Sequence, residues 1–113
     1  MTAESKSDEL IAFVAVRLAE DESQAQLFHE LGCAVAPGPG EVPRRRCHCP
    51  TPAWLTARVH ALQRVLRDCE KRIRRAGPED PDRPLGPTLA EVHVRAVALR
   101  FEEHPQWREE WRP

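Results

Sequence analysis

The chain has 113 residues and a formal net charge of −1, with 41% hydrophobic and 31% charged residues. This length predicts a single domain, and the near-neutral charge argues against disorder, which is typical of chains with high net charge. The first ten residues are too polar for a signal peptide, and no apolar run approaches the ~20 residues that a membrane span needs. We therefore expect a cytoplasmic protein with reduced thiols and no membrane contact.

The small net charge hides an uneven distribution along the chain. Residues 1–31 contain seven acidic and two basic residues, whereas residues 44–76 contain ten basic and two acidic ones. Residues 77–113 are again acidic, with eight acidic and five basic residues. The simplest interpretation is that neighbouring helices of one bundle neutralise each other. The alternatives are a basic surface for nucleic acid or another polyanion, and an acidic protein partner.

The first predicted element is a helix over residues 8–31. Ser7 or Asp8 can cap its N-terminus, and Gly32 can end it. One broad apolar face contains Leu10, Ile11, Val14, Leu18, Ala25 and Phe28, and a second, poorer face contains Phe13, Val16, Leu27 and Leu31. Because Asp21 projects toward the apolar face, we expect an arginine of the second helix near it, or a bend.

Residues 32–51 form a proline-rich connection, since four prolines and two glycines between residues 34 and 50 leave no room for a regular element. A connection of this length is typical of functional or disordered loops. The second helix follows over residues 52–76, where Thr51 can cap and Pro52 suits the first helical position. Its apolar seam has steps of four and three residues: Leu55, Val59, Leu62, Leu66, Cys69 and Ile73. Its outer face carries His60, Arg64, Arg67, Lys71 and Arg74.

A second proline-rich connection over residues 77–87 leads to a third helix over residues 88–102, for which Thr88 and Glu91 form a capping box. Its main apolar face contains Leu89, Val92, Ala96 and Leu99, and a second face contains Ala90, Val94, Val97 and Phe101. A short helical turn over residues 105–111 should use Trp107 and Trp111 to hold the tail on the bundle. The sequence thus predicts an all-α fold in one domain over residues 1–113. The architecture is a three-helix antiparallel bundle with a short C-terminal helical turn and Pro-rich connecting loops.

Three stretches, DELIAFV (8–14), RLAEDE (17–22) and HPQWREEWRP (104–113), resemble those of a family of small actinobacterial and actinophage proteins of unknown function. The second helix resembles the family's middle helix less specifically. Many members of this family also have a histidine and several cysteines around the connection before the third helix, which suggests a set of zinc ligands. This chain has no cysteine in residues 77–87, so the resemblance supplies neither that site nor any catalytic residue.

The sequence contains one local group of metal-ligand residue types, and zinc requires four such ligands. Its members are Cys47 and Cys49, with His29 and Cys33 upstream. Alternatively, Cys33 and Cys69 are small core residues and the Cys47-His48-Cys49 segment is an exposed loop. Apart from this possible zinc, no cofactor is expected.

No phosphate-binding loop, dinucleotide fingerprint or zinc-protease motif occurs, and no nucleophile has an evident base beside it, so we expect no enzyme. The leading hypothesis is a non-catalytic protein–protein interaction or accessory module with an unidentified protein partner. A zinc-stabilised helical domain is one alternative. The other is a nucleic-acid-binding module that uses Arg44, Arg45, Arg46, Arg64, Arg67, Lys71 and Arg74.

Overall fold

A computed structural model describes residues 5–28, 50–75 and 85–113, and all structural statements below concern these residues. They form helices α1 (Lys6–Ala25), α2 (Pro50–Arg74) and α3 (Gly86–Ala98), then the short 3-10 helices η1 (Leu99–Phe101) and η2 (Glu109–Trp111). The predicted all-α fold class is confirmed, and the described residues contain no strand. No described helix is long and apolar enough to cross a membrane.

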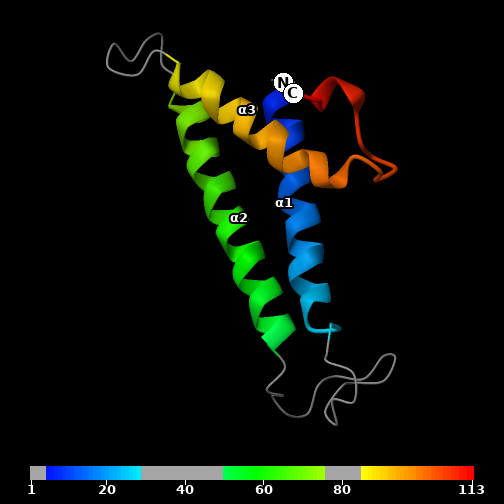
Figure 1. The fold of residues 1–113 in the computed structure, drawn as a ribbon. Coiled ribbons are helices and arrows are strands. Elements are labelled where there is room, and N and C mark those ends of the chain that lie inside the picture. The colour runs from blue at the N-terminus through cyan, green and yellow to red at the C-terminus, as the bar shows by residue number, and fades with distance from the viewer. Residues whose placement is uncertain (1–4, 29–49, 76–84) are drawn as a thin grey trace.

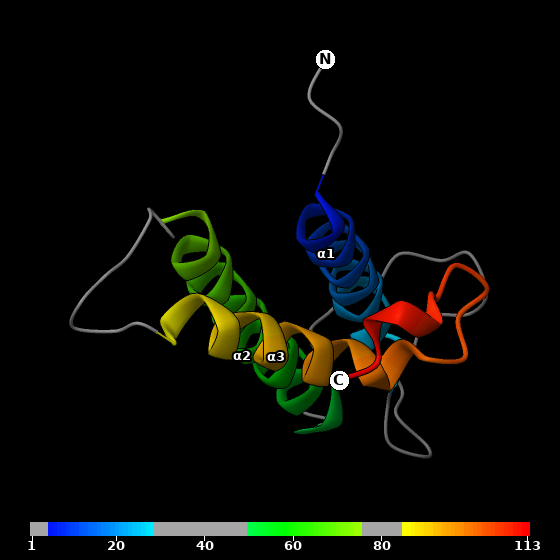
Figure 2. The ribbon, with the colours of Figure 1, turned by 90° about the horizontal axis from the view of Figure 1, so that it is seen from above.

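α1 and α2 lie side by side and run antiparallel, whereas α3 crosses in front of both at an oblique angle (Figure 1). The view from above shows α3 lying across one side of the α1–α2 pair (Figure 2). The predicted antiparallel arrangement therefore describes α1 and α2, and the third helix departs from it. The tail after α3 turns back and packs on α1.

Both ends of α1 differ from the prediction. Ser5, and not Ser7 or Asp8, is the N-cap: its side chain accepts a hydrogen bond from the backbone N–H of Asp8 at 3.1 Å, and the Asp8 carboxylate accepts one from the Ser5 N–H. This capping box satisfies two backbone donors that a later start would leave free. The helix ends at Ala25 instead of residue 31, because Leu27 and Phe28 are 67% and 54% exposed and provide no packing to extend it.

The core lies where the three helices meet. The side chains of Leu10, Val14 and Leu18 on α1 are essentially inaccessible to solvent. The predicted seam of α2 is confirmed, because Val59, Leu66 and Cys69 are buried and Leu62 and Ile73 are partly buried against the same cluster. α2 begins at Pro50, two residues before the predicted start. The other residues of the predicted 32–51 loop lie outside the described residues.

Most of the face of α3 that the sequence suggested as the main one is exposed, and of its four residues Leu99 alone is half-buried. Ala90, Val94 and Ala98 are buried, whereas Leu89 and Val92 are 56% and 45% exposed. The buried side of α3 carries small side chains because these allow the helix to pack closely against α1 and α2 where it crosses them. The predicted capping box at residues 88–91 is also wrong: the helix begins at Gly86 after Leu85, with no side-chain cap and a proline in its first turn.

The tail packs on α1 through aromatic rings, as predicted. Phe13 is the centre of this contact, and its ring centroid lies 4.8 Å from that of Trp111 and 6.3 Å from those of Trp107 and Phe101. Trp111 is only 4% exposed. The helical turn is shorter than the predicted 105–111 and covers residues 109–111. Phe13, which the sequence placed on a poorer second face of α1, is thus 7% exposed and fully part of the core.

Candidate functional site

All four predicted zinc ligands, His29, Cys33, Cys47 and Cys49, lie outside the described residues. Among the residues that the structure does describe, no group of three or more His, Cys, Asp or Glu side chains could hold a metal ion. Zinc binding therefore stays a prediction. Cys69 fits the apolar interpretation, since it is 3% exposed in the core and burial raises the pKa of its thiol. A thiol with a raised pKa is a poor nucleophile.

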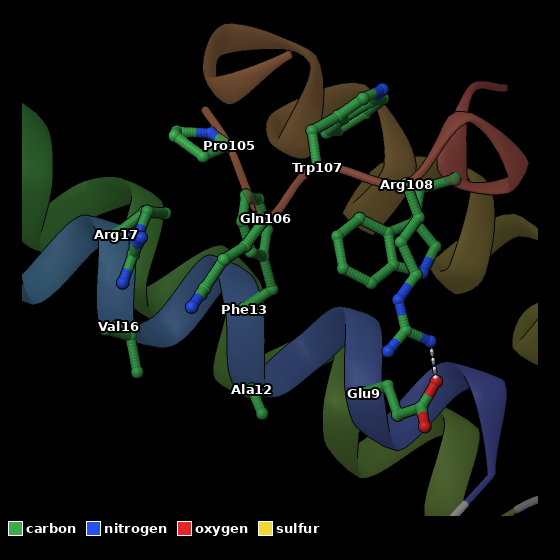
Figure 3. A pocket seen from close by; sticks show the side chains of 10 residues that line it. Glu9, Ala12, Phe13, Val16, Arg17, Pro105, Gln106, Trp107 and Arg108 are labelled. Atoms are coloured by element: carbon green, nitrogen blue, oxygen red, sulfur yellow. Dashed lines mark hydrogen bonds and ion pairs between the residues drawn. The ribbon is translucent and has the colours of Figure 1, made fainter. Parts of the chain in front are cut away.

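A groove of about 730 Å³ lies between α1 and the tail (Figure 3). Its apolar wall is formed by Phe13, Trp107 and Trp111. At one end, Arg108 Nη1 donates to Glu9 Oε2 at 2.6 Å, which joins the tail to α1 across the groove. The same guanidinium lies 5.5 Å from the ring centroid of Trp111.

At the other end of the groove, Arg17 is a nearly buried arginine that is 9% exposed. Its guanidinium lies over the ring of Phe13 and pairs with Glu20 at 3.0 Å. One of its terminal nitrogens contacts the ring of His104, whose Nδ1 accepts a hydrogen bond from the backbone N–H of Gln106 at 3.0 Å. The contact between Arg17 and His104 joins α1 to the tail.

Sequence reasoning did not single out Arg17 or His104 as partners. A signal for Arg17 exists, because it stands between Val14 and Leu18 on the face of α1 that packs inward. No comparable signal exists for His104, which reaches Arg17 only because the tail turns back. The tail contains a further pair, in which a hydrogen bond from Arg112 lowers the pKa of Glu109.

The α2 basic face, which consists of His60, Arg64, Arg67, Lys71 and Arg74, is exposed to solvent. Its two ends are paired with α1: His60 Nε2 lies 2.9 Å from Glu22, and Arg74 Nη2 lies 3.5 Å from Asp8. Hydrogen bonds from His60 and Gln63 lower the pKa of Glu22.

The middle of the α2 basic face has no such partner. Arg64, Arg67 and Lys71 make no ion pair with any residue in the described part of the chain. Two acidic residues of α1 that could have reached α2 are used elsewhere, since Glu20 pairs with Arg17 and Asp21 with Arg100 at 3.5 Å. Arg58 of α2 lines the same pocket as Asp21, in line with the expected arginine of the second helix nearby, but the ion-pair partner of Asp21 is Arg100 of η1. Arg44, Arg45 and Arg46 lie outside the described residues.

The α3 outer face is the second exposed surface of interest, and it consists of Leu85, Leu89, Val92 and Ala96. The first three side chains are 62%, 56% and 45% exposed. Their spacing of four, three and four residues places them in one row. This row lies on the opposite side of the helix from the buried Ala90, Val94 and Ala98.

Comparison with known protein families identifies the family of this chain. Residues 7–113 match the model of DUF6221, a family of unknown function. The chain belongs to DUF6221. No curated protein and no solved structure matches the chain.

Membership of DUF6221 confirms the expected kinship with a family of unknown function, and it assigns no activity. The structure gives the resemblance a physical meaning. Residues 8–22 of α1 and residues 104–113 of the tail, which carry the most specific likeness, meet at the groove through Phe13, Arg17 and Trp111. In this DUF6221 chain the two stretches thus have a packing role in common.

Proposed function

We propose that this DUF6221 protein is a non-catalytic interaction module that binds another protein through the α3 outer face. The observation that supports this proposal is the row of Leu85, Leu89 and Val92, whose side chains are about half exposed or more. A helix that is apolar on opposite sides belongs in an interior. Since α1 and α2 cover one side only, a partner would cover the other.

An amphipathic helix is the partner that fits this surface. Apolar residues in steps of four and three match the side-chain rows of another helix, which can pack between them. Arg95 and Arg100 border the α3 outer face on its two sides. A second copy of α3 packed in parallel would place each arginine near its own counterpart, whereas an antiparallel copy would place Arg95 near the start of the partner helix. The partner that we propose is a helix of a different protein; Arg95 and Arg100 already pair with Glu91 at 3.2 Å and Asp21 at 3.5 Å, so its apolar row and not its charge would provide most of the contact.

The absence of catalysis in this proposal is supported by how the polar groups of the described residues are used. Arg17, His104, Glu9 and Arg108 all hold the tail against α1. The buried Cys69 thiol has a raised pKa, which disfavours the reactive thiolate.

The proposal is tested by placing a photo-crosslinking amino acid at position 89 in cells, with position 19 as control. Ala19 is exposed on α1, away from the α3 outer face. The protein crosslinked from position 89 alone is then purified, and its affinity for the uncrosslinked chain is measured. We expect Leu89→Glu to weaken binding at least tenfold, because a charge would enter the apolar contact, and Ala19→Glu to leave it unchanged. Equal affinity of the Leu89→Glu variant and the parent would refute the proposal.

A further inference from the structure

We infer that the outward side of α2 also binds the phosphate backbone of a nucleic acid duplex. The α2 phosphate face, as we name it, consists of Arg64, Arg67, Lys71 and Arg75. It omits His60 and Arg74, whose side chains are directed to Glu22 and Asp8 of α1. This inference is independent of the protein contact at α3.

The four residues of the α2 phosphate face form a straight row along the helix. At 100° per residue its four members fall within about 80° of one another, on the side of the helix opposite the buried Val59, Leu66 and Cys69. Arg75 continues the helix, since its N–H donates to the carbonyl of Lys71 at 2.9 Å. From residue 64 to residue 75 the row is roughly 16 Å long at 1.5 Å per residue. Because the strands of a duplex wind around its axis, a straight row of this length can contact only a few neighbouring phosphates.

The charge of this row is available for a ligand. The acidic residues next to it on α2 are directed to other cations, because Asp68 lies 3.9 Å from Arg72 and Glu70 lies 2.9 Å from Arg74. No member of the α2 phosphate face makes an ion pair within residues 5–28, 50–75 and 85–113. Those acidic residues that form ion pairs in the described part of the chain thus pair with other cations and not with this row.

A duplex fits the row better than a membrane or an acidic protein does. The apolar side of α2 is packed in the core, so a membrane would meet charge alone, without apolar insertion. Guanidinium groups match phosphate geometry by donating two hydrogen bonds at once, and three of the four cations are arginines. A duplex also presents several phosphates at a regular spacing, which a single acidic peptide segment does not.

The test measures binding of the purified chain to a fluorescent 20-base-pair duplex by fluorescence polarisation. Nonspecific phosphate binding through three or four cations predicts a Kd in the micromolar to 100 micromolar range at low salt. It also predicts that affinity falls by about 20- to 50-fold between 50 and 150 mM salt, since the slope is roughly −0.9 per phosphate contact. No detectable binding by the parent chain at 50 mM salt would overturn the inference.

Matched variants on the same helix identify the surface. Arg67→Gln should reduce the magnitude of the salt slope by about one, whereas Arg72→Gln, which removes the same charge from a neighbouring exposed position, should leave it unchanged. Changing all four residues of the α2 phosphate face to Gln should abolish binding, with the helical circular dichroism of the parent retained. Equal effects of Arg67→Gln and Arg72→Gln would overturn the assignment to this face. Tighter binding of poly-glutamate than of the duplex would overturn the choice of nucleic acid.

Discussion

Adjacent residues of α2 differ greatly in their expected contribution to stability. Leu66 is 6% exposed at the centre of the seam, whereas Val65 is 42% exposed. We expect Leu66→Ala to lower the free energy of unfolding by about 2–5 kcal/mol, because it removes buried methyl groups and leaves a cavity. Val65→Ala should change it by less than about 0.5 kcal/mol. Urea denaturation of the two variants measures both values, and equal losses would mean that the seam does not face the core.

Arg17 shows how an arginine can belong to a hydrophobic core. Its stem and guanidinium lie against Phe13, and its charge is compensated by Glu20 at 3.0 Å. Its Nε has no hydrogen-bond partner within the described part of the chain. Such an atom carries a desolvation cost, which the contacts of the guanidinium with Glu20, Phe13 and His104 offset. The residue thus links α1 to the tail through packing as much as through charge.

The contact between Glu22 and His60 makes stability depend on pH in a defined direction. Hydrogen bonds from His60 and Gln63 lower the pKa of the Glu22 carboxyl below its ordinary value of 4.5. The contribution of this carboxylate is therefore complete above pH 4.5 and is lost as the pH falls through the lowered folded-state value. We expect Glu22→Gln to have a lower Tm than the parent at pH 6, and the Tm difference to shrink as the pH falls below 4.5. A Tm difference that does not shrink as the pH falls would show that the side chain acts through something other than its charge.

At the scale of elements, α3 has two apolar sides with different roles. Val94 is 1% exposed, while Leu89 is 56% exposed. We expect Val94→Ala to cost about 1.5–3 kcal/mol of unfolding free energy, as the loss of a buried valine side chain does. The larger truncation Leu89→Ala should cost less than about 0.5 kcal/mol. Thermal unfolding followed by circular dichroism compares the two, and the reverse order of stabilities would mean that the sequence-based choice of face was right.

The buried side of a helix could be predicted from the sequence where the apolar residues define only one side of that helix. The seam of α2 is such a case, because its six apolar residues define a single side of the helix. α3 is not, since two sets of apolar residues fit a helix equally well, and the choice between them depends on a crossing with α1 and α2 that is set by tertiary packing. The partners of the acidic residues of α1 were unpredictable for the same reason. Asp21 meets Arg100 only because η1 follows α3 across the pair.

At the scale of the whole molecule, the tail is part of the hydrophobic core. Trp111 and Trp107 pack edge to face with centroids 5.8 Å apart, and both face Phe13 of α1. Arg95 of α3 donates to the carbonyl oxygen of Glu110 at 2.7 Å, which fixes the end of the tail to a second helix. The tail and the helices should therefore unfold in one step.

A tryptophan variant can test this coupling. Trp54 is 60% exposed on α2, so in Trp54→Phe the remaining fluorescence comes from Trp107 and Trp111 alone. We expect the fluorescence and the circular dichroism at 222 nm to give the same thermal midpoint in this variant. In the same background, Trp111→Ala should cost about 3–5 kcal/mol of unfolding free energy. A fluorescence change that precedes the loss of helix would show that the tail detaches on its own.

The pairing of Glu9 with Arg108 joins residues that are 99 positions apart in the sequence. Protein synthesis proceeds at about 5–20 residues per second, so the partner of Glu9 is made roughly 5–20 s after Glu9 itself. During this interval Phe13 is already exposed at the ribosome, while the indoles that cover it do not yet exist. Each newly made molecule thus passes through a stage in which one side of α1 is open to chaperones and to aggregation.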